Sequence, residues 1–253
     1  MAYSDIRSLF NAIESLDETQ IELVDRITQQ FKSPHSFKFL RDSDIVSETW
    51  LRHFGNVLMI HHATSAAPFG KEKFEFGFIY ASMRSGVEAT KPTSRTNPGH
   101  DLTLNGYPIS LKTQSDAGLK ESHIHISKFM ELGRGEWDFE LLRNQFFAHM
   151  RSYERIFTLR TLINTESHMK YELVEIPKSL LLESDGLEFQ RGKLRIKNPE
   201  LSSGYCHVRD TQGNIKFSLY FDGGGERKLQ IQKIDKSLCI VHAVWEFEVN
   251  KLF

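Results

Sequence analysis

The chain has 253 residues, which is enough for one large domain or two small ones, and its hydrophobic content of 40% supports a sizeable core. Its 32 Lys and Arg residues balance 33 Asp and Glu residues, so there is no global basic excess of the kind that marks many nucleic-acid-binding proteins. A site-specific nuclease is not excluded, because it can use local clusters of basic side chains without being basic overall.

The first residues are polar and lack the apolar region of a signal peptide, and no apolar run approaches the length of a membrane span, so we expect a cytoplasmic protein. Residues 4–16 and 17–32 carry apolar side chains at helical spacing and predict two amphipathic helices, the second with Asp17 as its N-cap. These helices could form an N-terminal support or a dimer arm. Residues 44–54 predict a third, short helix.

Residues 71–86 predict a helix that ends at a glycine. Phe74, Phe78 and Ala81 form one apolar stripe along it. Glu75 lies beside this stripe, near the middle of the helix, so its carboxylate is expected close to the buried side.

Residues 100–113 predict two short strands joined by a tight turn at Asn105-Gly106. Asp101 stands at the start of the first strand and Lys112 near the end of the second, so antiparallel pairing brings their side chains together. A carboxylate that can hold a divalent cation, close to an ammonium that can orient water, is the minimum for metal-assisted phosphodiester hydrolysis. An ordinary hairpin with an Asp and a Lys remains the alternative.

Residues 137–152 predict a further helix, and residues 155–163 and 171–176 are rich in β-branched and aromatic side chains and predict strands. From about 188 to 253 the chain predicts short strands separated by Gly, Asn and Asp turns. This order of elements indicates an α+β or α/β protein with a mixed sheet.

The middle of the chain, roughly residues 70–178, resembles the PD-(D/E)xK superfamily, the fold of type II restriction endonucleases. The resemblance is carried by the helix with Glu75, the step Pro98-Gly99-His100-Asp101 and the strand end Ser110-Leu111-Lys112. It implies a mixed β-sheet flanked by helices, in a catalytic core at 70–185. The N-terminal helical region, 1–69, would pack on this core, and a β-rich region, 186–253, would follow it and could recognise DNA.

The resemblance also implies the chemistry of the site. A Mg²⁺ ion would be held by Asp101, Glu75 and the backbone carbonyl of Leu111, while Lys112 would orient the attacking water and help to lower its pKa. The sequence departs from the family at Ser110, where an acid is usual. Glu75 is our first choice for the second acid and Glu121 our second, and the Ser110 hydroxyl could still contribute.

The residues that we expect to contact DNA are Lys91, Arg95, Gln114, Arg227 and Lys228. The first two belong to a loop, 91–99, that precedes the active-site strand, and Gln114 follows Lys112. The last two stand beyond a glycine-rich turn in the hairpin 217–231. A β-ribbon with basic residues near its tip can enter the major groove, although an ordinary surface hairpin is an equal alternative.

Two other groups of residues have metal-binding chemistry. His123 and His125 lie on one face of a predicted strand and could bind a metal, but such a pair more often forms the polar face of a half-buried strand. Cys206 and Cys239 are far apart and lack a CxxC partner, which indicates two buried free thiols in a reducing compartment.

The sequence therefore predicts a Mg²⁺-dependent type II restriction endonuclease that cuts double-stranded DNA as a homodimer. A cognate DNA methyltransferase would be a functional partner and not a physical one. Two alternatives remain open: a catalytically inactive DNA-binding protein of the same fold, and an interaction protein that binds no nucleic acid.

Overall fold

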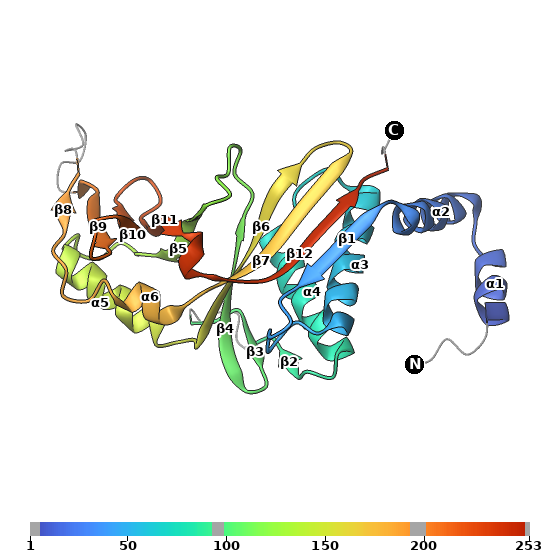
Figure 1. Ribbon diagram of the computed structural model, residues 1–253, viewed down its shortest axis with the longest axis horizontal. Coiled ribbons are helices and arrows are strands. Elements are labelled where there is room, and N and C mark those ends of the chain that lie inside the picture. Colours follow the sequence, from blue (N-terminus) through green and yellow to red (C-terminus); the bar gives the residue numbers. More distant parts are fainter. Residues whose placement is uncertain (1–5, 93–98, 193–200, 251–253) are drawn as a thin grey trace.

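The computed structural model describes residues 6–92, 99–192 and 201–250, and its strands form two β-sheets (Figure 1). The seven-stranded sheet has the order β1 (His35–Phe39), β12 (Ile240–Glu248), β7 (His168–Ile176), β6 (Arg155–Asn164), β4 (Tyr107–Gln114), β3 (Leu102–Leu104) and β2 (Ala89–Thr90). The five-stranded sheet has the order β5 (His123–Glu131), β11 (Lys228–Asp235), β10 (Ile215–Asp222), β9 (Gly204–Arg209) and β8 (Gln190–Arg191). Because β4 and β6 pair in parallel while the neighbouring pairs are antiparallel, the predicted mixed sheet is confirmed.

Helices cover one side of each sheet (Figure 1). The helices are α1 (Ile6–Glu14), α2 (Glu18–Lys32), α3 (Glu48–Thr64), α4 (Lys71–Arg84), α5 (Phe139–Met150), α6 (Lys178–Leu182) and the 3₁₀ helix η2 (Lys236–Leu238). One hydrophobic core lies between α3, α4 and the seven-stranded sheet, and a second core lies between α5, α6 and the five-stranded sheet. The predicted restriction-endonuclease-like arrangement, a mixed sheet flanked by helices, is therefore confirmed.

The predicted apolar stripe of α4 is completely buried, with Phe74, Phe78 and Ala81 each 0% exposed. Trp50 of α3 packs against it, since its ring lies edge-on to that of Phe78 and its indole N–H donates to Ser82 Oγ at 3.0 Å. Burial of aromatic side chains on this scale dominates the energetics of a core. Helix α3 thus holds α4, and with it Glu75, firmly against the sheet.

Two predictions about local structure need correction, and one strand was missed. The helix expected at 44–54 begins at Glu48, because Ser47 caps it, and continues to Thr64, because buried apolar residues recur at helical spacing beyond Phe54. Strand β1 was not predicted, since it is a short strand at the edge of the sheet with largely exposed side chains. Both cysteines are free thiols, but only Cys206 is fully buried.

The predicted N-cap Asp17 is confirmed as part of a capping box with Gln20.

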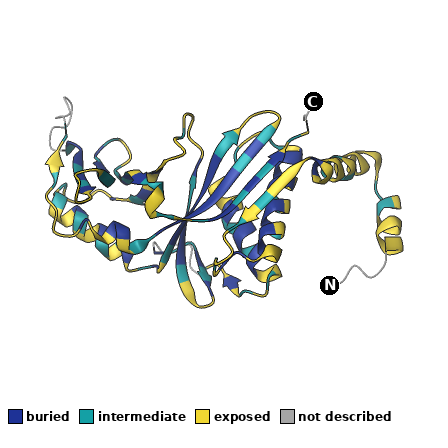
Figure 2. Cartoon of the chain, in the orientation of Figure 1, coloured by how far each residue is buried: buried dark blue, intermediate teal, exposed yellow. Residues whose placement is uncertain are grey.

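The N-terminal helices extend away from the sheets (Figure 1), and α1 has no buried residue (Figure 2). Helix α2 contacts α3 and is tied to the end of β12 by Gln30, whose side-chain amide donates to the Glu248 carbonyl at 2.7 Å. Among the described residues, no helix combines the length and the apolar character needed to cross a membrane.

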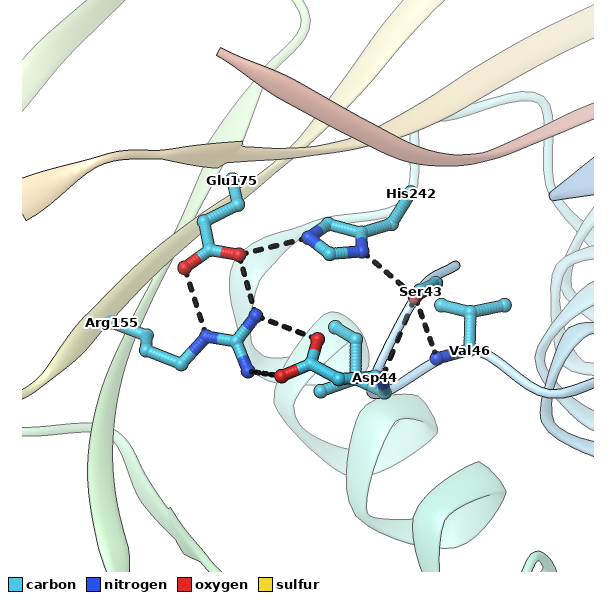
Figure 3. A network of polar contacts seen from close by, with 7 residues as sticks. Ser43, Asp44, Val46, Arg155, Glu175 and His242 are labelled. Atoms are coloured by element: carbon cyan, nitrogen blue, oxygen red, sulfur yellow. Dashed lines mark hydrogen bonds and ion pairs between the residues drawn. The ribbon is translucent and has the colours of Figure 1, made fainter. Parts of the chain in front are cut away.

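A polar network anchors the segment before α3 to the seven-stranded sheet (Figure 3). The guanidinium of Arg155 donates to Glu175 at 2.6 and 2.8 Å and to Asp44 at 2.6 and 3.0 Å. His242 joins Glu175 to Ser43, with nitrogen–oxygen distances of 2.8 Å on both sides of its ring. This network links β6, β7 and β12 to the chain that enters α3.

Arg160 joins the two sheets and is 0% exposed. From β6, it donates to the side chains of Gln114 and Glu172, to two backbone carbonyls in the connection between β4 and β5, and to one at the start of β5. A guanidinium has five N–H donors, and each of these bonds uses one of them. Glu172 also forms an ion pair with Lys236, beside the end of β11, at 3.1 Å.

We therefore predict that Arg160→Met lowers the free energy of unfolding by about 3–5 kcal/mol, because a buried carboxylate and several carbonyls lose their partner. Arg52→Met is the matched control. Arg52 forms an exposed ion pair with Glu48, with a side chain 71% exposed, and its loss should cost no more than about 0.5 kcal/mol. Urea unfolding of both variants measures the difference, and equal stabilities would contradict the role of Arg160.

Candidate active site

The hairpin of β3 and β4 forms as predicted. Asn105 and Gly106 both have positive φ, at 48° and 83°, as a type I′ turn requires. The strands pair Leu102 with Ile109 and Leu104 with Tyr107. The Asp101 N–H donates to the Ile109 carbonyl at 3.0 Å, so the pairing extends to the residue that carries the carboxylate.

The Asp101 carboxylate is held by three groups. Its Oδ2 accepts from the Leu111 N–H at 2.6 Å and from the Ser110 hydroxyl at 3.1 Å, and its Oδ1 lies 2.7 Å from Lys71 Nζ. Burial acts to raise the pKa of Asp101, but the ammonium groups of Lys112 and Lys71 outweigh it and hold the pKa below its usual value. Asp101 is therefore a fixed, ionised carboxylate at neutral pH.

Glu75 lies next to this carboxylate and is connected to it through Lys71. The Lys71 ammonium, one helical turn before Glu75 on α4, is 3.8 Å from Glu75 Oε1 and also pairs with Asp101. The other Glu75 oxygen is 3.0 Å from Lys91 Nζ, and the Glu75 side chain is only 15% exposed. Two carboxylates thus share one cation.

Lys112 is the second ammonium of the site. Its Nζ lies over the ring of Phe129, 5.4 Å from the ring centre. Burial lowers the pKa of Lys112 to about 8, although the negative charges of Asp101 and Glu75 act in the opposite direction. The prediction that the hairpin brings Asp101 and Lys112 together is confirmed.

These side chains open into a cavity of about 820 Å³. Lys71, Asp101, Ser110 and Lys112 line one side of it. The other side is formed by β5, with Phe129 and Glu131, and by the second half of α5 and the residues after it, with Gln145, His149 and Ser152. The site therefore lies where β4 of the seven-stranded sheet contacts β5 of the five-stranded sheet.

Sequence reasoning missed two of these residues. Lys71 has one signal, its spacing of four from Glu75, but nothing in the sequence relates it to Asp101. His149 Nε2 is buried and has no hydrogen-bond partner among the described residues. Burial and the nearby Lys112 lower the pKa of His149 to about 4, so its imidazole is neutral at pH 7.

The donor atoms at this site suit a hard divalent cation. Asp101 and Glu75 offer carboxylate oxygens, and the Lys71 ammonium already occupies a position between them. Mg²⁺ is commonly bound by one or two carboxylates together with water, so these two acids fit it. Among the described ranges, no cluster of three or more His, Cys, Asp or Glu side chains could hold a metal.

The alternative acid, Glu121, is exposed in the connection between β4 and β5, where its backbone carbonyl accepts from Arg160. The geometry therefore favours Glu75 as the acid next to Asp101. The Leu111 N–H supports the Asp101 carboxylate, and a metal-binding role for the Leu111 carbonyl stays a prediction. His123 and His125 flank the buried Ile124, as expected for the polar face of a half-buried strand.

The residues expected to contact DNA have different surroundings. Lys91 pairs with Glu75, and the buried Gln114 accepts from Arg160 at 2.9 Å, while Arg95 and Pro98 lie outside the described residues. Arg227 donates to the Gly135 carbonyl at 2.8 Å and lies over the Trp137 ring, and Lys228 is 3.6 Å from Glu226.

The hairpin that carries Arg227 and Lys228 is not a free ribbon. Strand β11 pairs with β5 as well as with β10, and β10 also pairs with β9, so both strands lie inside the five-stranded sheet. At the turn, a Cβ on Gly223 would lie 2.2 Å from the Leu201 carbonyl oxygen, so this glycine is required by close packing. DNA contacts by this hairpin stay a prediction.

Comparison with known proteins identifies the family. Residues 9–247 match the family model SmaI, described as type II site-specific deoxyribonuclease. The chain is also 47% identical over 206 residues to the type II restriction enzyme SmaI of Serratia marcescens, and this alignment covers 81% of the chain and 82% of the relative. No solved structure matches the chain. With a match across almost its entire length, the chain belongs to the SmaI family of type II site-specific deoxyribonucleases and is a restriction endonuclease that acts on specific sites in DNA.

Proposed function

We propose that this endonuclease depends on Mg²⁺ and hydrolyses the phosphodiester bond in the cavity between Asp101 and Lys112. The observation that carries the proposal is the shared cation site, in which the Lys71 ammonium lies 2.7 Å from Asp101 and 3.8 Å from Glu75. Asp101, Glu75 and the Leu111 carbonyl would hold the metal ion. When bound, a divalent cation would stabilise the negative charge that develops on the phosphate and on the leaving oxygen.

The side chains of the active site have separate roles in the proposed reaction. The Leu111 N–H and the Ser110 hydroxyl hold Asp101 in one orientation, so Ser110 acts through this carboxylate. Lys112 Nζ orients the attacking water, and its lowered pKa eases the transfer of a proton at this nitrogen. Lys71 supplies a second ammonium that can face a non-bridging phosphate oxygen.

We expect Asp101→Ala and Lys112→Ala each to reduce cleavage more than about 100-fold, because each removes a charged group at the reacting phosphate. The Lys112 variant should keep its affinity for DNA, since the change leaves the carboxylates in place. Cleavage of plasmid and phage DNA with Mg²⁺, with chelator as the blank, measures the rate. Lys170→Ala, on β7, is the control for loss of a lysine. Near-normal cleavage by either site variant would refute the assignment.

The second acid is tested by a separate pair of variants. Glu75→Gln should lose Mg²⁺-dependent cleavage at least about 100-fold, because a neutral amide cannot replace the carboxylate next to Asp101. Glu121→Gln is the matched control and should cleave normally. Cleavage rates measured over a range of Mg²⁺ concentrations distinguish the two variants. The opposite result would transfer the role of second acid to Glu121.

We also propose that Lys91, Arg95, Gln114, Arg227 and Lys228 contribute DNA contacts, and that the enzyme acts as a homodimer beside a methyltransferase that protects the same DNA sites. The dimer is supported by α1, where Ile6, Leu9 and Phe10 are 73%, 47% and 62% exposed. An apolar surface of this kind on a helix without buried residues favours association with a second copy.

The variant Leu9→Asp is expected to shift the protein from dimer to monomer, because it places a charge in the apolar face of α1. Sedimentation velocity over a range of protein concentrations measures the change. Asn11→Asp adds the same charge to the same helix at a polar position and should leave the dimer intact. A dimer that persists in the Leu9 variant would contradict the role of α1.

A further inference from the structure

Three cavities are lined by residues of β4 and β5, and the first of them is the catalytic cavity. The catalytic cavity, with Lys112 and Phe129, adjoins a second cavity of about 440 Å³ that also contains Lys112 and Phe129 and continues through Thr113 and Ile126. A third cavity, of about 470 Å³, begins at the next residues along the two strands, Gln114 and His125. The third cavity therefore begins two residues after Lys112 on β4 and one residue before Ile126 on β5.

Gln232 and His125 line the third cavity, and Gln230 connects their side chains. Gln230 Oε1 accepts from Gln232 Nε2 and lies at the same distance, 3.1 Å, from His125 Nε2. The Gln230 amide in turn donates to Asp222 at 3.3 Å. Since Gln230 Oε1 can only accept, His125 Nε2 is the donor of this hydrogen bond. The three side chains are half-buried and hold one another in place.

Gln232 keeps free hydrogen-bonding capacity. One N–H is used by Gln230, and among the described residues neither its second N–H nor its Oε1 has a partner. An oriented amide with a free donor and a free acceptor can form hydrogen bonds to base edges in the major groove. A face that serves only for solubility usually carries charged side chains instead.

The backbone at the edge of the third cavity is strained. Lys233, which follows Gln232, has a φ of 54°, a conformation that is unfavourable for a lysine. It lies where the pairing of β11 with β5 shifts register between Ile231 and Ile234. Bulges of this kind change the direction of side chains and are common near functional sites, where strain is retained for a purpose.

We propose that His125, Gln230 and Gln232 form the surface with which this endonuclease reads base edges of its DNA site. The proposal rests on the proposed function, in which Lys112 acts at the phosphate that is cut, because the cavity lined by Gln232 and His125 begins at Gln114, two residues after Lys112 on β4. Gln232 contacts a base directly, whereas His125 and Gln230 orient it. Lys120 and Lys233, which line the third cavity, are placed to contact phosphates on either side.

The test compares Gln232→Ala with Gln212→Ala, a control that removes an exposed glutamine from the turn between β9 and β10 of the same sheet. Binding is measured by fluorescence anisotropy in Ca²⁺ without Mg²⁺, using a duplex with the site mapped from wild-type cleavage products and a duplex of random sequence. Gln232→Ala should bind the site about 5- to 150-fold more weakly and bind the random duplex unchanged, as expected for loss of one base contact. Gln212→Ala should match the wild type on both.

A second measurement uses cleavage of duplexes that each carry one altered base pair. Gln232→Ala should tolerate substitution at one position that the wild type rejects. If Gln232→Ala is unstable in thermal unfolding, Gln232→Glu keeps the volume but replaces the donor, and it should show the same loss on the site duplex. Unchanged site affinity, or equal loss on both duplexes, in a folded variant would overturn the proposal. Failure of the catalytic assignment appears separately, as normal cleavage by Lys112→Ala.

Discussion

The arrangement of the enzyme depends on the complete burial of Arg160 between its two sheets. A buried guanidinium is costly unless every donor is satisfied, and Arg160 meets this condition only if the chain between β4 and β5 folds back over β6. Strand β4 carries Lys112, and β5 carries Phe129 of the opposite wall. Arg160, which lies outside the catalytic cavity, therefore fixes the position of β4 relative to β5, and these strands form the two walls of the site.

The charged side chains of the catalytic site balance one another. Asp101 and Glu75 lie near the ammonium groups of Lys71 and Lys112, and each charge would be unfavourable there if it were unpaired. Lys71 pairs with both carboxylates and Lys91 pairs with Glu75, whereas Lys112 forms no short-range ion pair with any of the described residues. The replacement of an acid by Ser110 fits this balance, because its hydroxyl supports Asp101 without adding a third negative charge.

Cutting and recognition would then use neighbouring strands. The catalytic groups lie on β4, on α4 and at the residue before β3, while the amide and imidazole groups proposed to read DNA belong to the five-stranded sheet. Both sets are held on or next to helices and strands, which gives the positional precision that a functional site requires. Since β4 and β5 contact each other directly, displacement of one set would be transmitted to the other.

The sequence by itself determined the local elements and the chemistry that they carry. The Asn105-Gly106 turn predicts the hairpin, and the hairpin brings Asp101 to Lys112, because each inference depends on residues a few positions apart. The stripe of α4 follows from periodicity in the same way, and the mixed sheet follows from the order of the elements. Tertiary structure alone decided the position of Lys71 beside Asp101, of His149 in the cavity and of Arg160 between the sheets. Those contacts join segments that are 30 or more residues apart, and no local pattern encodes which distant partner will satisfy a buried charge.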